Sequence, residues 1–296
     1  MSAICRLFQD TADCPLSQET EYVDELGGGA FGTVYKARNR TTGRLFAVKI
    51  VDDMGGIGQE AAHRGEGVIL PKLDHEHIIR SFHSHGWDTR RAEIFMDLMD
   101  GDLHSLAYSV PKRQLEPLAR RVLHQMLQAL DYLSSLGLVH RDLKPANIFY
   151  TTTAAAATSQ NPEEQYHFRL GDFGLCENKS KLNTRSFAPG THLFMAPELL
   201  VRPRRHKQSH KSDVWALYVT LLWTKAVPGV RLQELLGRHS TTSAMEFAED
   251  LVAYDWGESV KNDPLRGMGK KNPGSRWTAG RVLDEMFEGV GRVTSD

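Results

Sequence analysis

Glycines and a lysine near the start of the chain are spaced in a way that suggests close contact with other groups. The segment ELGGGAFGTVYKA (Glu25 to Ala37) holds the pattern Gly27-x-Gly29-x-x-Gly32 inside a strand-like run. Glycine weakens a strand unless another backbone or a ligand must come close, so these residues predict such an approach. Lys49 follows in the apolar segment FAVKI. Burial of its ammonium group is unfavourable unless it meets an opposite charge.

The glycine pattern alone allows other interpretations. In a dinucleotide-binding turn the glycines open a helix, with an acidic residue about 20 positions later. Here the segment from Thr33 to Lys36 continues as a strand, so no helix N-terminus is available for a pyrophosphate. A glycine-rich surface hairpin is the structural alternative, and other segments must decide between it and a binding loop.

Three further segments complete an ordered set of motifs. They are VHRDLKPANIF (Val139 to Phe149), LGDFGL (Leu170 to Leu175) and MAPE (Met195 to Glu198). With the glycine segment and FAVKI, they make the chain resemble the protein kinase family from about Tyr22 to Phe287. HRDLKPAN and GTHLFMAPE resemble the serine/threonine branch. Five motifs in one order are far more specific than any one of them.

The resemblance implies phosphoryl transfer from ATP to protein hydroxyl groups. Lys49 matches the lysine that contacts the α- and β-phosphates, and Glu66 is favoured over Glu60 as its acidic partner. Asp142 matches the catalytic aspartate, which accepts or orients the proton of the attacking hydroxyl. Lys144 matches the lysine that steadies the γ-phosphate.

Other positions are implied to bind metal and nucleotide. Asn147 and Asp172 match the Mg²⁺ ligands, whose oxygen donors suit an ion that keeps several waters. Met96 aligns with the gatekeeper at the end of the adenine-binding edge. The remaining residues expected around ATP lie on the glycine segment, the hinge and the floor of the site. They are Leu26, Gly27, Gly28, Gly29, Ala30, Phe31, Gly32, Thr33, Val34, Ala47, Asp97, Met99, Asp102 and Phe149.

The activation segment and its supports are implied by the same resemblance. Thr191 should contact Asp142 and Lys144. Arg141 would be balanced by a phosphate at Ser186, with Thr184 as the second choice, because a phosphate brings about −2 charge. A solvated loop rich in serine and threonine is the alternative. The expected structural residues are Asp213, which should hold the catalytic loop, and Glu198 with Arg276, which should form a buried ion pair.

The elements that must position these residues indicate an α+β fold with the two lobes of a kinase, spanning about residues 20–290. Residues 20–99 read as short strands with one helix, roughly Gln59 to Leu70. Residues 100–290 read as mainly helical, notably EPLARRVLHQMLQALDYLSSLG, and later Asp213 to Trp223, Ala244 to Tyr254 and Thr278 to Phe287. The low-complexity stretch 151–165 reads as an exposed insertion between two strands, because hairpin loops usually have about 2–5 residues.

Composition limits the classes of partner. The chain has 296 residues and a formal net charge of −1, which argues against broad nucleic-acid or anionic-membrane binding. It lacks a run of about 18 apolar residues, so membrane insertion is not expected. Three cysteines without disulfide or metal spacing favour an intracellular location, in the cytoplasm or the nucleus.

Glycines in the helix preceding Leu70 depart from the family pattern. Gly65 and Gly67 should each weaken the helix by about 1 kcal/mol, so we expect a loosely held helix. The Lys49–Glu66 pair would then close with help from phosphorylation, an upstream kinase or another regulatory partner. The main alternative function is a pseudokinase that keeps the fold as a scaffold. A small-molecule kinase is a second alternative, disfavoured by GTHLFMAPE.

Overall fold

The chain divides into two compact units in the computed structural model. The first comprises residues 1–74 and 79–99, and the second comprises residues 75–78 and 100–296. The residues that the structure describes are 19–29, 32–52, 60, 63–88, 91–154, 159, 162–182, 191–201, 208–226, 241–253 and 264–295. Four predicted site residues, Ala30, Phe31, Thr184 and Ser186, lie outside these ranges.

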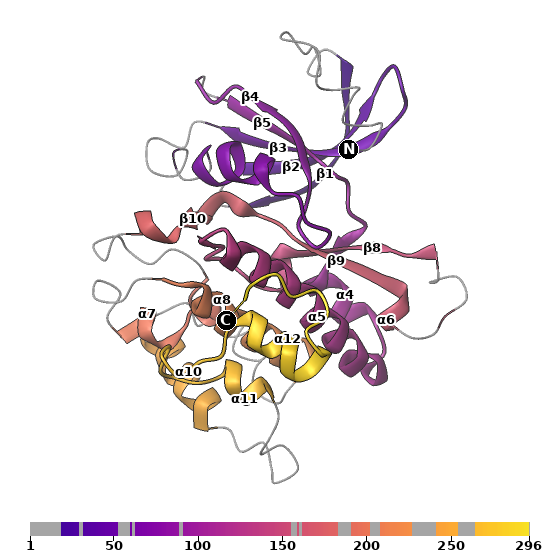
Figure 1. Ribbon diagram of the computed structural model, residues 1–296. Coiled ribbons are helices and arrows are strands. Elements are labelled where there is room, and N and C mark those ends of the chain that lie inside the picture. Colours follow the sequence, from indigo (N-terminus) through magenta and orange to yellow (C-terminus); the bar gives the residue numbers. More distant parts are fainter. Residues whose placement is uncertain are drawn as a thin grey trace. The chain divides into compact units, whose positions relative to one another are not determined.

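The first unit is built on a five-stranded antiparallel sheet (Figure 1). Its strands, in spatial order, are β1 (Thr20–Gly29), β2 (Gly32–Asn39), β3 (Leu45–Asp52), β5 (Arg91–Met96) and β4 (Ser81–His85). Because side chains alternate along a strand, Phe46 and Val48 face opposite ways from Ala47 and Lys49. Phe46, Val48 and Phe95 belong to a buried apolar cluster. Lys49 is therefore held by a strand with apolar neighbours on both faces.

The helix of the first unit differs from the predicted one. Its described part is a π-helix, η1 (His63–Ile69), followed by a 3₁₀ turn, η2 (Leu70–Lys72). The rings of His63 and Trp87 stack 4.9 Å apart. A Cβ atom on Gly67 would lie 2.7 Å from atoms of both rings. The glycine thus makes room for this ring pair, which the local sequence pattern does not reveal.

Long helices form the core of the second unit. α5 (Leu115–Ser135) buries an apolar stripe and packs against α8 (His210–Thr224) and α12 (Ala279–Phe287) (Figure 1). α5 is followed by Gly137 with φ of 67°, a left-handed conformation that suits glycine after a helix end. The shorter helices are α4 (Leu103–Ser109), α6 (Pro162–Gln165), α7 (Pro197–Val201), α10 (Thr241–Ala253) and α11 (Pro264–Met268). One strand-rich unit and one mainly helical unit confirm the α+β class.

Two small sheets hold the loops of the second unit. One has the order β6 (Gly101–Asp102), β8 (Ile148–Thr152) and β9 (Tyr166–Leu170), and the other pairs β7 (Leu138–Val139) with β10 (Glu177–Asn178). The segment 140–147 therefore connects β7 to β8, and Asp172 follows β9. Thr152 pairs with Tyr166, and the described part of the predicted insertion includes α6.

Two bulky residues of the second unit are matched by glycines. The ring of Tyr218 packs against Gly269, and a Cβ atom on that glycine would lie only 2.7 Å from the ring. The ring of Trp277 packs against Gly267 in the same way, and a Cβ atom there would lie 2.1 Å from it. The space that each large ring occupies is therefore provided by a missing side chain nearby. In the described part of the chain, no helix combines the length and apolar character that crossing a bilayer requires.

Candidate functional site

The first unit contributes a buried ion pair. Lys49 Nζ lies 2.8 Å from Glu66 Oε1, and both side chains are at most 8% exposed. Glu60 is exposed instead and lies 3.6 Å from Arg64. The pair is closed in this structure, and its need for phosphorylation or a partner stays a prediction. The ring of Trp87 packs against Gly67, and this contact is absent from an argument based on the helix propensity of glycine alone.

The glycine segment forms the hairpin of β1 and β2. Gly27 pairs with Val34, Gly28 with Thr33, and Gly29 with Gly32. Gly32 has φ of 130°, and a Cβ there would lie 2.0 Å from the carbonyl oxygen of Ile50. The close approach of β3 therefore requires a glycine at position 32, independently of any ligand that binds at the hairpin.

Two residues of the first unit that were predicted near the adenine are neighbours in the sheet. Ala47 pairs with Met96 across β3 and β5. The N–H of Asp97 donates to the carbonyl of Arg80 at 3.0 Å, so its main-chain contribution to a ligand would be the carbonyl oxygen. Its carboxylate also lies 3.6 Å from Arg44. Among the other predicted contacts, Leu26 is exposed and Thr33, Val34 and Met99 are half-buried.

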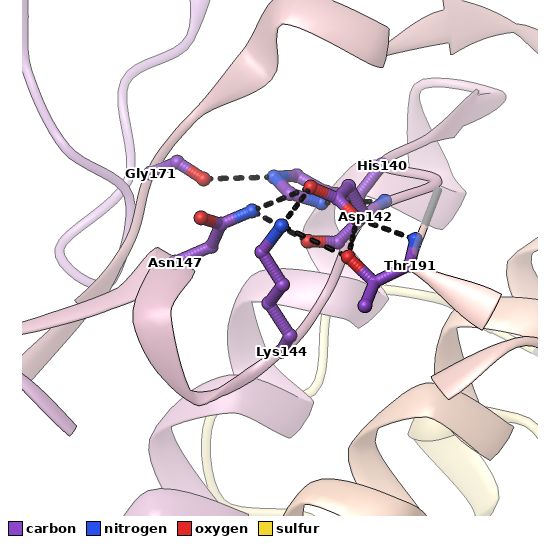
Figure 2. A network of polar contacts seen from close by, with 6 residues as sticks. All are labelled: His140, Asp142, Lys144, Asn147, Gly171 and Thr191. Atoms are coloured by element: carbon purple, nitrogen blue, oxygen red, sulfur yellow. Dashed lines mark hydrogen bonds and ion pairs between the residues drawn. The ribbon is translucent and has the colours of Figure 1, made fainter. Parts of the chain in front are cut away.

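In the second unit, the carboxylate of Asp142 is the centre of a polar network (Figure 2). Oδ2 accepts hydrogen bonds from Lys144 Nζ at 2.8 Å and Asn147 Nδ2 at 3.0 Å. Oδ1 accepts two from Thr191, one from its N–H and one from its hydroxyl, both at 3.0 Å. Lys144 also donates to the Thr191 hydroxyl at 2.9 Å. The structure therefore brings three predicted site residues together around Asp142, and of these Thr191 was the one expected to contact it.

His140 connects this loop to the segment after β9. Its Nε2 lies 3.0 Å from the carbonyl oxygen of Gly171, and its Nδ1 faces the N–H of Asp142 at 3.4 Å. These contacts fit the tautomer that carries its proton on Nε2. The ring also packs edge-on against Phe173, with centroids 4.8 Å apart. Gly171 precedes Asp172, so the imidazole links the catalytic loop to the predicted metal-binding segment (Figure 2).

Asp213 of α8 fixes the main chain of the same loop. Its carboxylate accepts the N–H of His140 at 2.8 Å and the N–H of Arg141 at 3.0 Å. Burial raises the pKa of Asp213 above its ordinary value, while the two N–H donors and the charge of Arg141 act in the opposite direction. Arg141 has φ of 77°, a conformation that is uncommon outside glycine. The buried carboxylate stabilises this strained turn directly before Asp142.

A residue that the sequence did not single out also contacts this turn. Gln208 is buried, and its Oε1 accepts a hydrogen bond from Arg141 Nε at 2.5 Å. Arg141 Nη1 donates to the carbonyl of Leu175 at 3.3 Å. The nearest sequence signal is the cap residue Ser209 at the start of α8, which places Gln208 at a helix boundary but does not point to Arg141.

Asp102 and Phe149 occupy defined positions in the second unit. They pair across β6 and β8. Asp102 is the N-cap of α4, where Oδ1 accepts the N–H of Ser105 at 2.8 Å. Its Oδ2 also accepts a weaker hydrogen bond from the Ser105 hydroxyl at 3.4 Å, so a ribose contact would have to compete with one of these two cap contacts.

The expected structural ion pair is also formed within the second unit. Arg276 donates to both carboxylate oxygens of Glu198, each at 2.8 Å, and is 1% exposed. Its guanidinium lies 5.2 Å from the ring centroid of Trp215. A bidentate pair of this kind fixes the orientation of both groups as well as their distance.

The donor set of the second unit fits Mg²⁺. Asn147 donates from its amide nitrogen to Asp142, which leaves its amide oxygen as the atom able to bind a cation. Asp172 has φ of 57° and offers a carboxylate from a left-handed turn. Within the described ranges, no cluster of three or more His, Cys, Asp or Glu residues could hold a metal ion. One carboxylate and one amide suit Mg²⁺, which keeps waters and binds phosphates.

Comparison with known proteins identifies the family. The model for the protein kinase domain matches residues 20–287. Serine/threonine-protein kinase 10 from Danio rerio is 31% identical over 279 residues, which cover 90% of this chain and 26% of that protein. The protein of the same name from Homo sapiens is 28% identical over 288 residues, covering 93% of this chain and 27% of that protein.

The match is limited to one part of these relatives. The chain spans about a quarter of the length of the curated relatives that it matches. The family model, in contrast, covers most of the chain and all five motifs. Two units of the expected kinds, one strand-rich and one mainly helical, agree with that match. The chain therefore belongs to the eukaryotic-type protein kinase family, and the relatives that it matches are members of the serine/threonine branch.

Proposed function

We propose that this protein is a serine/threonine protein kinase, which transfers the γ-phosphate of ATP to hydroxyl groups of protein substrates. The observation that supports this most strongly is the network around Asp142, in which Lys144, Asn147 and Thr191 hold one carboxylate by four hydrogen bonds. A carboxylate fixed in this way keeps its position while a substrate arrives, and positioning is much of what phosphoryl transfer requires.

Asp142 acts on the acceptor hydroxyl. The hydroxyl oxygen forms a bond to the γ-phosphorus, while the bond from that phosphorus to the β,γ-bridging oxygen breaks and ADP leaves with the electron pair. The hydroxyl proton moves toward the carboxylate of Asp142, which orients the oxygen for attack.

One contact of Asp142 must change for this step. A carboxylate offers about four acceptor positions, and four hydrogen bonds occupy them in the structure. Lys144 is the residue suited to leave, because its ammonium group can move to the γ-phosphate of a bound nucleotide. That movement would open a position on Oδ2 for the acceptor hydroxyl.

The remaining parts of the proposal concern ATP and metal. Lys49 binds the α- and β-phosphates, and Glu66 holds its ammonium group in place. The hairpin of β1 and β2 covers the phosphates, and Ala47 and Val34 contact the adenine. Asn147 and Asp172 hold Mg²⁺, which when bound neutralises charge on the phosphate oxygens.

The acceptor type is proposed from the activation segment and the relatives. Thr191 contacts both Asp142 and Lys144, as a serine/threonine kinase would require. The matched relatives are named serine/threonine-protein kinases.

A peptide-library assay with radiolabelled ATP and Mg²⁺ tests this proposal. We expect label on serine and threonine peptides, with little on tyrosine peptides. The Lys144→Met variant should lose about 100-fold in kcat, since removal of one positioning charge has effects of this order. Label on tyrosine alone would contradict the acceptor type. Absence of transfer from wild-type protein that binds ATP would instead support the pseudokinase alternative.

A further inference from the structure

The guanidinium of Arg141 donates hydrogen bonds to neutral oxygen atoms of two separate segments. Its Nε donates to the side-chain oxygen of Gln208, and Nη1 donates to the main-chain carbonyl of Leu175. A half-buried guanidinium loses solvation, so acceptors inside the fold stabilise its position. Hydrogen bonds from a charged donor are stronger than those between neutral groups. These contacts connect the catalytic loop to Gln208, which precedes α8, and to the segment after Asp172.

Gln208 itself is rigidly placed. It directly precedes Ser209, the N-cap of α8, and Ser209 forms a reciprocal capping box with Ser212. The N–H of Ser209 donates to Ser212 Oγ at 3.1 Å. Asp213 follows in the same helical turn and binds the main chain of Arg141. One helix end therefore holds Arg141 twice, by its main chain through Asp213 and by its side chain through Gln208.

We propose that Gln208 is a positioning residue that keeps Arg141, and through it Asp142, in the arrangement used for transfer without a phosphate in the activation segment. This inference rests on the proposed function. A phosphate at Ser186 or Thr184 would give Arg141 an anionic acceptor, but the carboxamide already supplies an acceptor within the fold. Phosphorylation of these residues is then unnecessary for activity.

The experiment compares Gln208→Leu with Gln208→Glu after phosphatase treatment. Leucine removes the acceptor at similar size, and glutamate restores it. We expect Gln208→Leu to lower kcat about 10-fold or more, because misplaced catalytic groups cost this much, with KM for ATP within about 2-fold. Gln208→Glu should recover activity to within about 3-fold of wild type on the same reasoning. Gln114→Leu, a change of the same kind elsewhere in this unit, should leave kcat unchanged.

Phosphatase treatment tests whether Arg141 needs a phosphate in the activation segment as its acceptor or is held by the carboxamide of Gln208. Wild-type protein and the Thr184→Ala/Ser186→Ala double variant should keep full activity after treatment. Loss of wild-type activity on treatment, or full activity of Gln208→Leu, would overturn this inference alone. Wild-type protein that is inactive both before and after treatment would overturn the proposed function together with it.

An NMR measurement tests the contact without any turnover. The Nε–H resonance of Arg141, assigned by its loss in Arg141→Lys, should exchange slowly with solvent in wild type and in Gln208→Glu. It should exchange rapidly in Gln208→Leu. Equal exchange in wild type and Gln208→Leu would show that Gln208 does not hold the guanidinium and would overturn the inference.

Discussion

The catalytic loop of the second unit and the π-helix of the first unit are stabilised in different ways. The catalytic loop is fixed by hydrogen bonds to the carboxylates of Asp142 and Asp213. The polar residues that form these bonds belong to motifs that can be recognised in the sequence. η1 depends on shape, because Gly67 makes room for the rings of His63 and Trp87. Sequence motifs therefore predict which polar side chains form hydrogen bonds in the loop. The reason for a glycine inside a helix, in contrast, is found only in the side chains that pack against it.

The largest effect should come from removing the carboxylate that fixes the loop. Asp213→Ala leaves two buried N–H groups without their acceptor, so we expect a loss of about 3–5 kcal/mol in the free energy of unfolding. Urea unfolding measures this loss, and transfer assays below the unfolding temperature should show reduced kcat.

Asp131→Ala is the matched control for this change. Asp131 is also buried and accepts two main-chain N–H groups, from Val293 and Thr294, but it does not touch the catalytic loop. It should lose a similar amount of stability while folded protein keeps its kcat. If both variants lose kcat equally, the loop does not depend on Asp213 specifically.

A smaller effect is expected from the buried charge pair of the first unit. Glu66→Gln keeps the size of the side chain but leaves the ammonium of Lys49 without its buried counter-charge, which should destabilise by about 3 kcal/mol. Glu60→Gln removes an exposed pair with Arg64 and should change stability by less than about 0.5 kcal/mol. Chemical denaturation of both variants checks the difference, and equal losses would argue against a special role for the buried pair.

Acid should weaken the second unit through His77. Burial, with a contribution from the charge of His167, lowers the pKa of His77 to about 3, and its Nδ1 lies 3.1 Å from the carbonyl oxygen of Phe168. The unfolded chain binds this proton near pH 6.5, so stability is complete above that pH and falls as the pH drops toward 3. From pH 7.5 to 5.0 we expect His77 to account for a loss of about 2 kcal/mol.

His77→Asn provides the comparison for the pH effect. An asparagine amide can still donate to Phe168 but does not titrate in this range. The urea midpoint of the variant should therefore fall less steeply between pH 7.5 and 5.0 than that of wild type. Parallel pH profiles would show that the acid sensitivity arises elsewhere.

The smallest effect sharpens the interpretation of the glycine-rich helix. Helix propensity alone would make Gly67→Ala stabilising by about 1 kcal/mol. The ring pair makes it destabilising by about 1 kcal/mol, since an added methyl group overpacks the contact. Thermal unfolding gives the sign, and the added change Trp87→Ala should reverse the penalty of the alanine. A stabilising single substitution would favour the propensity argument.

Sequence patterns predicted elements where apolar residues recur or run together. α5 follows from apolar residues at helical spacing, whereas β3 and α8 follow from apolar segments that are buried along most of their length. The segment from Ile78 onward has strand propensity, but β4 begins only at Ser81, and Ile78 instead forms an isolated bridge to Leu170. Strand propensity alone does not distinguish pairing of Ile78 within β4 from its isolated bridge to Leu170.

The site shows the same division between local and distant information. The contacts among Asp142, Lys144 and Asn147 follow from a motif in which all three lie within six positions. The contact between Gln208 and Arg141 joins residues 67 positions apart and has no charge signature, because an amide is neutral. Such pairings emerge only when folding brings α8 against the catalytic loop.

The most direct test of the proposed function is γ-phosphate transfer by wild-type protein and by Asp142→Asn. With saturating ATP and Mg²⁺, the variant should lose about 10³-fold in kcat, because its amide cannot accept the hydroxyl proton, while its Kd for ATP stays within about 2-fold. Transfer by Asp142→Asn at the wild-type rate, or no transfer by wild-type protein, would contradict the proposal.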